Sequence, residues 1–411
     1  MCAEALLFWD RALLAEDPRN EVTQEHSGEE PLGTIGEDRS GRGRSDEDRG
    51  EQVDGRKRYR SSYESGSSSM KLFVTGGAGF IGSNFIRHVL GIGRDFAVVN
   101  YDKLTYAGNL TNLESVASNP NYQFVKGDIC DAAFVEGAMR GCDAVIHFAA
   151  ESHVDRSIYE PAPVIQTNVT GTFVLLEAAR KVSVSRFVHV STDEVYGDIP
   201  ADTFADETFP LQPSSPYSAS KAASDLLVRS YVRTYKFPAV LTRSSNNYGP
   251  YQFPEKFVPL MITNALSDKA LPVYGDGKQQ RDWLHVEDNC RGILSVLEKG
   301  KIGEVYNIGG LDLEENLTLV RRILNLIGKP ENLVSYVQDR PGHDRRYALN
   351  CKKIETELGW RPAISLEDGV RGTIDWYMNQ GPWLAGVRSR EYLSYYEKYY
   401  ENRDRSLRAI A

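Results

Sequence analysis

The sequence predicts an α/β fold, with a doubly wound parallel sheet and a smaller C-terminal lobe that binds substrate. From Met70 to about residue 250, short apolar strands alternate with amphipathic helical stretches, and a glycine-rich turn at 75–82 follows the first strand. Buried parallel strands read as continuous apolar runs, and their alternation with helices is typical of βαβ units. After residue 250 this regularity weakens, and Pro, Gly and aromatic residues become more frequent.

Residues 1–69 differ in composition from the rest of the chain. After a short apolar stretch, Gly, Ser, Arg and Glu follow in aperiodic order up to Ser69. Such a segment cannot bury enough apolar surface to offset its ordering entropy. We expect a disordered extension over 1–69, a cofactor-binding Rossmann domain over 70–250, and a mainly substrate-binding lobe over 251–411, from which some segments return to the Rossmann sheet.

The strands of the predicted sheet are short apolar runs, each followed by a helical stretch. They are Lys71–Thr75, Phe96–Tyr101, Tyr122–Lys126, Ala144–Phe148, Arg186–Val190 and Ala239–Thr242. In the lobe, apolar residues at helical spacing predict helices over 286–298, 316–327 and 366–379. The aromatic and charged stretch 392–400 predicts a further packing helix.

Composition and charge exclude several classes of function. The chain has 411 residues and a formal net charge of -9, which opposes binding to nucleic acid or to an anionic membrane. No apolar run reaches the roughly 20 residues that span a bilayer. The five cysteines are scattered and form no CxxC pair, which favours reduced thiols in the cytoplasm and predicts no metal site.

The run TGGAGFIG at 75–82 follows the first strand and opens a helix. Glycines at this position permit a tight turn and a close approach of backbone to a pyrophosphate, and the helix N-terminus favours the negative charge. Asp102 ends the second strand, 20 residues after Gly82, where its carboxylate can accept hydrogen bonds from both ribose hydroxyls. The same carboxylate repels a 2′-phosphate, so we expect the cofactor to be NAD rather than NADP.

A second group of residues indicates proton transfer beside the cofactor. Tyr217 follows Pro216 at a predicted helix start, and Lys221 lies one turn further on the same face. A tyrosine with an ordinary pKa of about 10 is a poor base at neutral pH, and a nearby lysine can favour its phenolate. Asp193 and Glu194 follow the fifth strand and add two carboxyls, which by themselves would read as a solvated charge pair.

Together these motifs resemble the extended short-chain dehydrogenase/reductase family. Within that family, the chain from Met70 to about residue 380 is most similar to the nucleotide-sugar 4,6-dehydratases that act on dTDP-glucose. The motifs that carry the resemblance are TGGAGFIG at 75–82, DKLTYAGN at 102–109, AAESHVDRS at 149–157, STDEVYG at 191–197, YSASK at 217–221, SNNYGP at 245–250, RDW at 281–283 and DRPGHD at 339–344.

The resemblance implies an internal redox cycle. Tyr217 would take the proton of the sugar C4 hydroxyl as hydride passes from C4 to NAD, with Lys221 binding the nicotinamide ribose and Thr192 orienting the C4 hydroxyl. Glu194 would then remove the C5 proton while Asp193 protonates the departing C6 hydroxyl. Hydride returns from NADH to C6. Two neighbouring carboxyls must therefore hold different protonation states.

The resemblance also implies contacts with cofactor and substrate, and a homodimer. The cofactor contacts are Gly76, Gly79, Phe80, Ile81, Gly82, Asp102, Lys103, Leu104, Thr105, Asp128, Ile129, Ala149, Ala150, Ser152, Thr167, Tyr217, Lys221 and Asn247. The contacts with the nucleotide sugar are Ser152, Thr192, Asn246, Lys256, Phe257, Pro272, Val273, Tyr274, Arg281, Asn316, Asp339 and His343. The planar fork of Arg281 suits a diphosphate.

Other functions remain open at this stage. UDP-glucose dehydratases are close relatives, and DRPGHD favours the dTDP sugar. Nucleotide-sugar 4-epimerases share the fold, the NAD and the Tyr/Lys pair. At the positions where this chain has Thr192-Asp193-Glu194, however, they have a sequence similar to Ser-Ser-Ala/Ser. A catalytically silent NAD-sensing scaffold is a third interpretation. We expect His147 to be a core residue, and the sequence leaves the role of His153 undecided.

Overall fold

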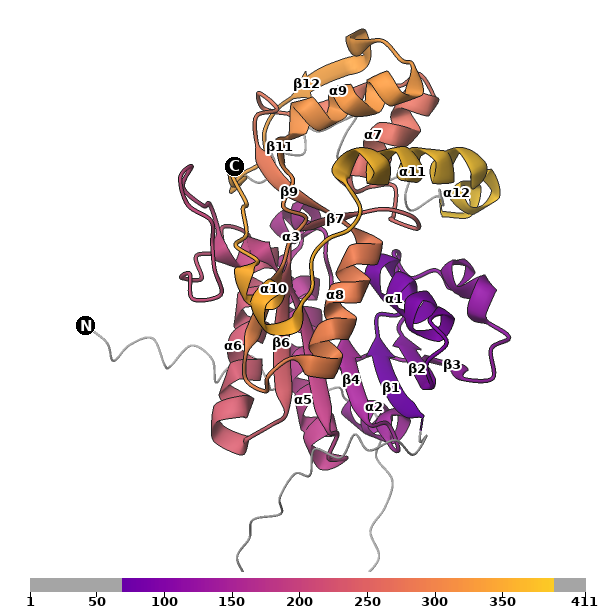
Figure 1. Cartoon of the computed structure of the whole chain (residues 1–411), viewed down its shortest axis with the longest axis vertical. Coiled ribbons are helices and arrows are strands. Elements are labelled where there is room, and N and C mark those ends of the chain that lie inside the picture. The colour runs from indigo at the N-terminus through magenta and orange to yellow at the C-terminus, as the bar shows by residue number, and fades with distance from the viewer. Residues whose placement is uncertain (1–68, 388–411) are drawn as a thin grey trace, which may run out of the picture. The chain divides into compact units, whose positions relative to one another are not determined.

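The central feature of the computed structural model, which describes residues 69–387, is a sheet of seven parallel strands (Figure 1). In sheet order the strands are β10 (Val305–Ile308), β6 (Ala239–Ser244), β5 (Arg186–Thr192), β4 (Ala144–His147), β1 (Met70–Thr75), β2 (Phe96–Asp102) and β3 (Tyr122–Lys126). Strand order reverses between β4 and β1. In open sheets of this kind, ligands bind at such a reversal, beyond the carboxyl ends of the strands.

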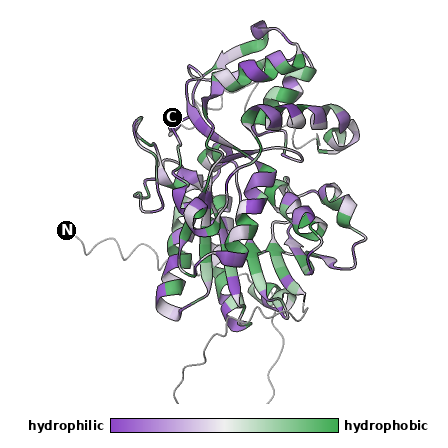
Figure 2. Ribbon diagram, viewed as in Figure 1, coloured by the Kyte–Doolittle hydropathy of each residue, from purple (hydrophilic) through white to green (hydrophobic). Residues whose placement is uncertain are grey.

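Helices cover both faces of the sheet. Along β1, Leu72 and Val74 belong to a core shared with the helices on one face, and Phe73 belongs to the core on the other, as the period of two in a strand requires. The first core includes α1 (Phe80–Gly91) and α8 (Val286–Lys299), with α10 (Lys352–Leu358); the second includes α2 (Ala132–Met139), α5 (Thr172–Lys181) and α6 (Pro216–Tyr235). Figure 2 shows apolar strands between these helices.

A smaller lobe follows the sheet in the chain. Its strands are β7 (Asn246–Tyr248), β8 (Leu271–Tyr274), β9 (Gln280–His285), β11 (Leu313–Glu315) and β12 (Val334–Val337), paired as β11-β9-β7 and β12-β8. Its helices are α7 (Phe257–Leu266), α9 (Asn316–Ile327), α11 (Leu366–Asn379) and α12 (Gly381–Val387), which share a core of their own. Two short helices, α3 (Val154–Tyr159) and α4 (Pro161–Ile165), follow β4.

The structure confirms the predicted fold class and most predicted elements. The strand at 122–126 and the helices at 316–327 and 366–379 have the expected bounds, and other ends differ by one or two residues. Residue 250 is not a clean boundary, because α8 and β10 follow it and still pack in the Rossmann core. The predicted extension before Ser69 and the predicted helix at 392–400 lie outside the described residues.

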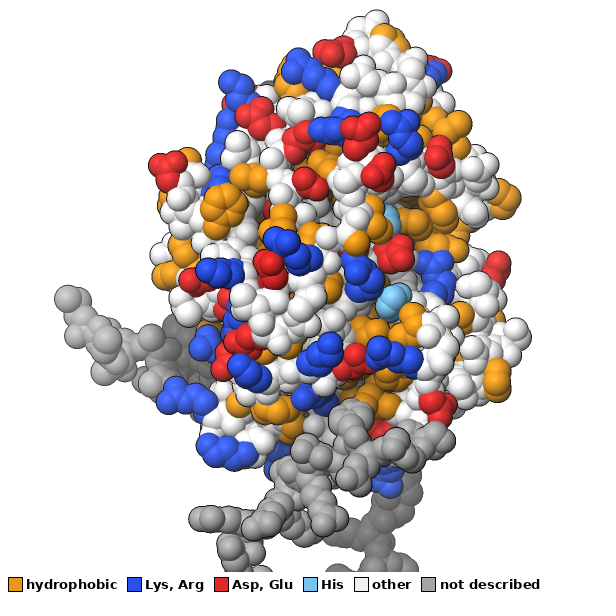
Figure 3. Space-filling model, in the orientation of Figure 1, with side chains coloured by type: hydrophobic (Ala, Val, Ile, Leu, Met, Phe, Trp, Pro, Cys, Tyr) orange, Lys and Arg blue, Asp and Glu red, His pale blue; other side chains and the backbone are white. Residues whose placement is uncertain are grey.

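The surface of the described part of the chain carries charges of both signs. On the face drawn in Figure 3, basic and acidic side chains lie side by side over the lobe. Among residues 69–387, no helix is both long and apolar enough to cross a membrane. No group of three or more His, Cys, Asp or Glu side chains in this range is arranged to hold a metal ion.

Candidate active site

Two cavities meet beyond the carboxyl ends of the sheet strands. The larger, of about 310 Å³, is lined by residues that follow β1, β2, β4, β5 and β6. The smaller, of about 170 Å³, lies toward the lobe. Five residues line both: Ser152, Glu194, Asn246, Glu255 and Lys256. The structure therefore offers one continuous site with a part formed by the Rossmann sheet and a part formed with the lobe.

The glycine-rich turn forms one wall of the larger cavity. Gly76 has a φ of +69°, and a Cβ atom there would lie 2.6 Å from the backbone nitrogen of Ala149. A Cβ atom on Gly82 would lie 2.3 Å from the carbonyl oxygen of Gly76. These positions require glycine, because the obstacles are backbone atoms. The turn thus brings the N-terminus of α1 close to the β4 end, and within the described chain no side chain caps that terminus.

Asp102 closes another wall of the same cavity. Its carboxylate oxygens accept hydrogen bonds from the backbone N–H groups of Ala78 at 2.9 Å and Leu104 at 2.7 Å. Burial raises the pKa of this carboxyl, and the two hydrogen bonds oppose the rise. Nearby, Lys103 Nζ forms an ion pair with Asp128 Oδ2 at 2.7 Å. These contacts fix the orientation of a carboxylate beside the glycine turn.

The structure brings the predicted cofactor residues together with one exception. All of them line the larger cavity except Leu104. Leu104 has a φ of +57°, and it reaches the site only through the backbone N–H that it donates to Asp102. A contact between Leu104 and the cofactor therefore stays a prediction, with its backbone N–H already directed to the Asp102 carboxylate.

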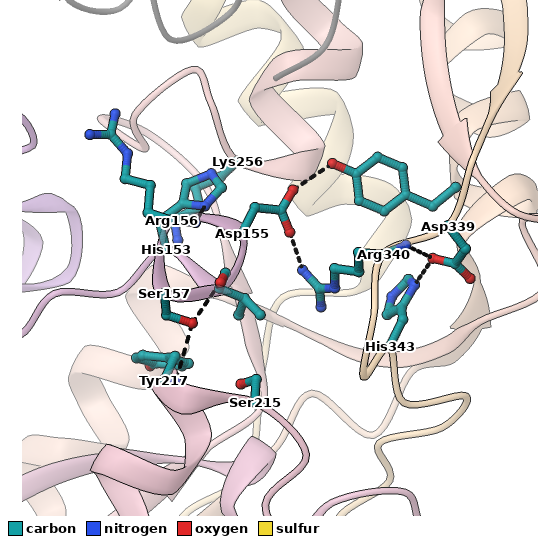
Figure 4. A network of polar contacts seen from close by, with 12 residues as sticks. His153, Asp155, Arg156, Ser157, Ser215, Tyr217, Lys256, Asp339, Arg340 and His343 are labelled. Carbon is teal, nitrogen blue, oxygen red and sulfur yellow. Dashed lines mark hydrogen bonds and ion pairs between the residues drawn. The ribbon is translucent and has the colours of Figure 1, made fainter. Parts of the chain in front are cut away.

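The redox pair lies at the start of α6. A capping box between Ser215 and Ser218 and a proline in the first turn begin this helix. The backbone N–H of Tyr217 donates to Ser157 Oγ at 3.2 Å, as Figure 4 shows. Lys221, one turn further, donates from Nζ to the carbonyl oxygen of Val190 at 2.8 Å. The Lys221 ammonium is therefore held against β5.

Burial dominates the acid–base properties of this pair. It raises the pKa of Tyr217, the carboxyls of Glu194 and Asp193 add to the rise, and a hydrogen bond with Thr192 opposes it. Burial also lowers the pKa of Lys221 to about 8, against the opposing charge of Asp225. The sequence predicted that Lys221 favours the phenolate. In this structure, without bound cofactor, burial and the two carboxyls instead raise the pKa of Tyr217, which favours the neutral phenol.

Asp193 and Glu194 form the first turn of a short 3₁₀ helix, Asp193–Tyr196, directly after β5. Thr192 caps it: the N–H of Glu194 donates to Thr192 Oγ1 at 3.3 Å. The Thr192 hydroxyl in turn donates to Asp193 Oδ1 at 3.2 Å. Asp193 is only 1% exposed, and its Oδ2 has no hydrogen-bond partner among the described residues. The two carboxyls are thus placed on one rigid turn at the sheet end.

Different neighbours separate these carboxyls electrostatically. Burial raises the pKa of Asp193 well above its ordinary value, and the negative charges of Glu194 and Asp282 raise it further. Burial raises the pKa of Glu194 too, but the cations Arg340, Arg281 and Lys256 oppose this rise. Asp193 is consequently the neutral acid of the pair, and Glu194 is the one more readily ionised.

Three cations line the smaller cavity. Lys256 Nζ donates to the carbonyl oxygen of Ser152 at 2.6 Å. Arg340 Nη1 pairs with Asp155 Oδ1 at 3.0 Å, and the other oxygen of Asp155 accepts the hydroxyl of Tyr274 at 2.8 Å (Figure 4). Arg281 donates to the backbone carbonyls of Gln280, Asp344 and Arg345. Because a guanidinium has five N–H groups, these contacts leave a side-on fork of two donors.

Apolar side chains form the remaining wall of this cavity. The rings of Phe257 and Trp283 stack with centroids 5.7 Å apart and an interplanar angle of 21°. Leu260, Met261 and Pro272 lie beside them. Within the described chain, the buried Oδ1 atoms of Asn246 and Asn316 have no hydrogen-bond partner. A flat apolar slot with polar groups at its edge is typical of a site for a nucleobase.

Most predicted substrate residues line one of the two cavities, but two do not. Val273 is fully buried in the lobe core, because side chains alternate along β8 and its neighbours Pro272 and Tyr274 face the cavity. A contact between Val273 and the substrate stays a prediction. Asp339 lies outside the cavity and instead accepts a hydrogen bond from His343 Nδ1 at 2.6 Å, which fixes the ring that does line it.

Sequence reasoning did not single out several residues of the site. Asp155 and Trp283 lay inside motifs quoted for the resemblance, whereas Arg340 belongs to the 339–343 segment, which the resemblance implied as a whole to be a substrate contact. Glu255, which lines both cavities, belongs to no such motif. The motifs could have indicated the first three, whereas Glu255 lies in the site only because the segment before α7 folds across the strand ends.

The two histidines near β4 have structural surroundings. His147 is 1% exposed and hydrogen bonds the hydroxyls of Thr75 at 2.8 Å and Thr172 at 3.0 Å, as a core residue. His153 caps α3 by accepting the N–H of Arg156, and its Nε2 lies 3.9 Å from Glu255 Oε1. Burial lowers the pKa of His153 to about 4, so this ring is neutral.

Comparison with known proteins identifies the family. The sequence profile of a family described as GDP-mannose 4,6 dehydratase matches residues 73–373. A dTDP-glucose 4,6-dehydratase of Shigella flexneri is 51% identical over 361 residues, which cover 81% of this chain and 100% of the relative. The chain belongs to the dTDP-glucose 4,6-dehydratase family. One of Neisseria meningitidis serogroup B is 52% identical over 345 residues, covering 78% of this chain and 97% of the relative.

Solved structures of this family have the same fold. A dTDP-glucose 4,6-dehydratase of Streptomyces venezuelae, crystallised with NAD and TYD bound, is 50% identical, covers 77% of this chain and 100% of its own, and gives a TM-score of 0.76. A UDP-glucose 4-epimerase of Thermotoga maritima is 31% identical, covers 75% of this chain and 99% of its own, and gives a TM-score of 0.71. The fold alone therefore does not separate dehydratase from epimerase.

Proposed function

We propose that the protein is an NAD-dependent lyase that converts dTDP-glucose to dTDP-4-keto-6-deoxyglucose. The observation that carries this proposal is the presence of Asp193 and Glu194 in one cavity with Tyr217, each in a different electrostatic environment. An enzyme that only oxidises and reduces C4 has no use for an acid and a base on a neighbouring turn. Dehydration needs both.

The walls of the larger cavity fit NAD. Gly76 and Gly82 permit the tight turn that leads into α1, whose uncapped N-terminus suits a pyrophosphate, and the fixed carboxylate of Asp102 suits a ribose diol. Asp128 and Lys103 would border the adenosine, and Lys221 would hold the nicotinamide ribose. NAD, when bound, accepts hydride from C4 and returns it to C6. The protein residues supply the proton transfers.

Tyr217 takes the proton of the C4 hydroxyl, which Thr192 orients. Before the sugar binds, the phenol must give its own proton to water, which the positive charge of an oxidised nicotinamide in the same cavity would favour. Oxidation at C4 acidifies C5, so that Glu194 can take the C5 proton. Asp193, held neutral by burial, gives its proton to the C6 hydroxyl, which departs as water. Glu194 then returns a proton to C5.

The smaller cavity suits a nucleoside diphosphate. The side-on fork of Arg281 can donate two parallel hydrogen bonds to a phosphate, and Arg340 and Lys256 add positive charge. Phe257 and Trp283 provide the apolar slot for the base, with Asn316 at its edge. Ser152, Asn246, Tyr274 and His343 would complete the contacts with the sugar and its phosphates.

A panel of nucleotide sugars tests this proposal. Mass spectrometry should show that dTDP-glucose loses one water, faster than UDP-glucose does. With deuterium at C4, the label should appear at C6 of the product without exchange with solvent. If deuterium stays at C4 of an epimerised sugar, the protein is an epimerase. If no nucleotide sugar is turned over although NAD binds, the NAD-sensing interpretation holds.

We infer that the protein acts as a homodimer in the cytoplasm. On α5 and α6, the apolar side chains of Phe173, Leu226 and Tyr235 are 46%, 56% and 53% exposed, which supports a helical interface between two copies. The cysteines among the described residues are unpaired, as in a reducing compartment. Sedimentation of the protein, with Leu226→Glu as the variant that should yield monomers, tests the dimer.

A further inference from the structure

Three separate segments of the chain outside the strands of the sheet line the larger cavity. They are residues 103–109 after β2, residues 151–156 after β4, and residues 252–256 before α7. Each contributes to the cavity wall, through Thr105, Ser152 and Phe253 among others. None of the three segments is a strand of the sheet. Their positions over the cavity therefore depend on the contacts that they make with one another.

Tyr106 lies where these segments meet. Its neighbours Thr105 and Ala107 line the cavity, whereas its own ring packs between the other two segments. The guanidinium of Arg156 lies over the ring, 3.7 Å from its centroid. The ring of Phe253 meets it edge-on at 5.7 Å. Tyr106 also hydrogen bonds the side chain of Glu255. One side chain thus contacts both neighbouring segments.

Arg156 and Glu255 join the remaining pair of segments. Arg156 Nη2 donates to Glu255 Oε2 at 3.0 Å, and the Glu255 carboxylate is only 1% exposed. A second tie runs alongside, from Lys256 Nζ to the carbonyl oxygen of Ser152. Figure 4 shows Arg156 directed away from the pair formed by Asp155 and Arg340. A buried ion pair with a stacked ring is geometrically specific, since each charge loses much of its attraction if the other moves.

We propose that Tyr106, Arg156 and Glu255 form a clasp that keeps the dinucleotide from leaving its cavity. The clasp joins the three wall segments pairwise, so that none of them can move away from the cavity without breaking one of these contacts. This role is positional, because Tyr106 does not line the cavity and takes no part in proton transfer. The clasp accordingly governs how long the cofactor stays, and not how fast the chemistry runs.

Retention of the cofactor matters because of the proposed redox cycle, and the inference rests on the proposed function in this respect. Halfway through the cycle C4 has been oxidised and the two electrons are on NADH. If NADH leaves then, C6 receives no hydride, and a 4-keto sugar is released with the cofactor reduced. A site that closes over the dinucleotide prevents this loss.

Retention of NAD in the absence of any sugar tests the clasp directly. Full-length protein is loaded with radiolabelled NAD, and the label is chased with unlabelled NAD. Tyr106→Ala should release the label at least tenfold faster than the unaltered protein, and Tyr106→Phe, which keeps the ring, less than threefold faster. Tyr336→Ala removes a tyrosine that is 58% exposed on β12, and it should change nothing. Equal release by Tyr106→Ala and the unaltered protein overturns the proposal.

A second variant and a second readout guard against misfolding. Arg156→Gln removes the stacked charge and the ion pair without touching the Tyr106 ring, and it should also release NAD at least tenfold faster. During turnover, pyruvate with lactate dehydrogenase traps escaped NADH as lactate. Both variants should yield lactate, and the unaltered protein none; absence of lactate from variants that release NAD quickly contradicts retention during the cycle. Failure of the unaltered protein to dehydrate dTDP-glucose would reject the proposed function, while the chase still decides whether the clasp retains NAD.

Discussion

Replacing Asp193 by asparagine should stabilise the protein while removing most of its activity. Asp193 is 1% exposed, and Thr192 Oγ1 donates to its Oδ1 at 3.2 Å. Asparagine keeps that acceptor and nearly the same shape. It carries no proton that it can give to a departing hydroxyl, and it can carry no negative charge in this buried position.

The stability change follows from the pKa of the carboxyl. Folding raises the pKa of Asp193 above its ordinary value of 3.8, so the side chain destabilises the folded state at higher pH and has no such effect below pH 3.8. Keeping this carboxyl neutral at pH 7 costs at most about 4 kcal/mol. Asparagine recovers only part of this free energy of folding, because its buried N–H₂ group lacks a hydrogen-bond partner and therefore carries a cost of its own. We expect Asp193→Asn to gain about 1–3 kcal/mol at pH 7, and less toward pH 4.

The loss of activity follows from the proton. A positioned acid contributes roughly 10²–10⁴ to the rate, which corresponds to about 3–5 kcal/mol in the barrier. Turnover of Asp193→Asn should fall by this factor at every pH. Lower turnover together with higher stability is typical of a site where burial holds a group in its reactive form.

Urea unfolding without cofactor, together with steady-state turnover, measures both effects. Asp375→Asn is the matched control, because Asp375 is exposed on α11 and should change neither quantity. If Asp193→Asn is less stable than the unaltered protein at pH 7, or retains turnover within about tenfold, then Asp193 is not the buried acid.

Three further predictions concern the redox half of the cycle, the cofactor and the chain start. Glu194→Gln should slow water loss by roughly 10²–10⁴ while C4 oxidation continues, so that rapid-mixing absorbance shows NADH accumulating. Tyr217→Phe should show neither NADH nor product. NADH in the Tyr217→Phe variant would contradict the role of Tyr217 as base. Asp102→Ala should reduce the preference for NAD over NADP. Equal affinity of the unaltered protein for NAD and NADP in a binding titration would refute the assignment of Asp102 to the ribose diol. A chain that begins at Met70 should keep turnover and melting temperature; a loss of more than about tenfold in turnover would show that the preceding residues take part.

Local sequence patterns were sufficient for much of the fold. The strand at 122–126 and the helices at 316–327 and 366–379 were predicted with correct bounds, because their apolar periodicity agrees with their local propensity. The strand β10 was not predicted. It is only four residues long, and it joins the sheet after the chain has already entered the lobe. A return of some segment to the sheet was expected, but which segment returns depends on packing between parts of the chain that are distant in sequence.

The sequence by itself determined which residue types form the site and the order in which they occur. The glycine turn at 75–82, Asp102, the carboxyls after β5 and the Tyr217–Lys221 pair each follow a local rule, either for strand ends or for helix starts. The parallel sheet then places them together, because all its strands end at the same edge.

Only the tertiary structure decided how these groups behave. Arg340 and Lys256 oppose the rise in the pKa of Glu194, whereas Glu194 and Asp282 add to the rise in the pKa of Asp193, and Arg281 opposes both rises. Val273 packs in the lobe core, and Tyr106 packs against Arg156. Both placements depend on contacts with segments that are distant in sequence. The burial of a group and the electrostatic effect of nearby charges on its pKa change over a few ångströms. Contacts between segments that are distant in sequence set the distances between these groups.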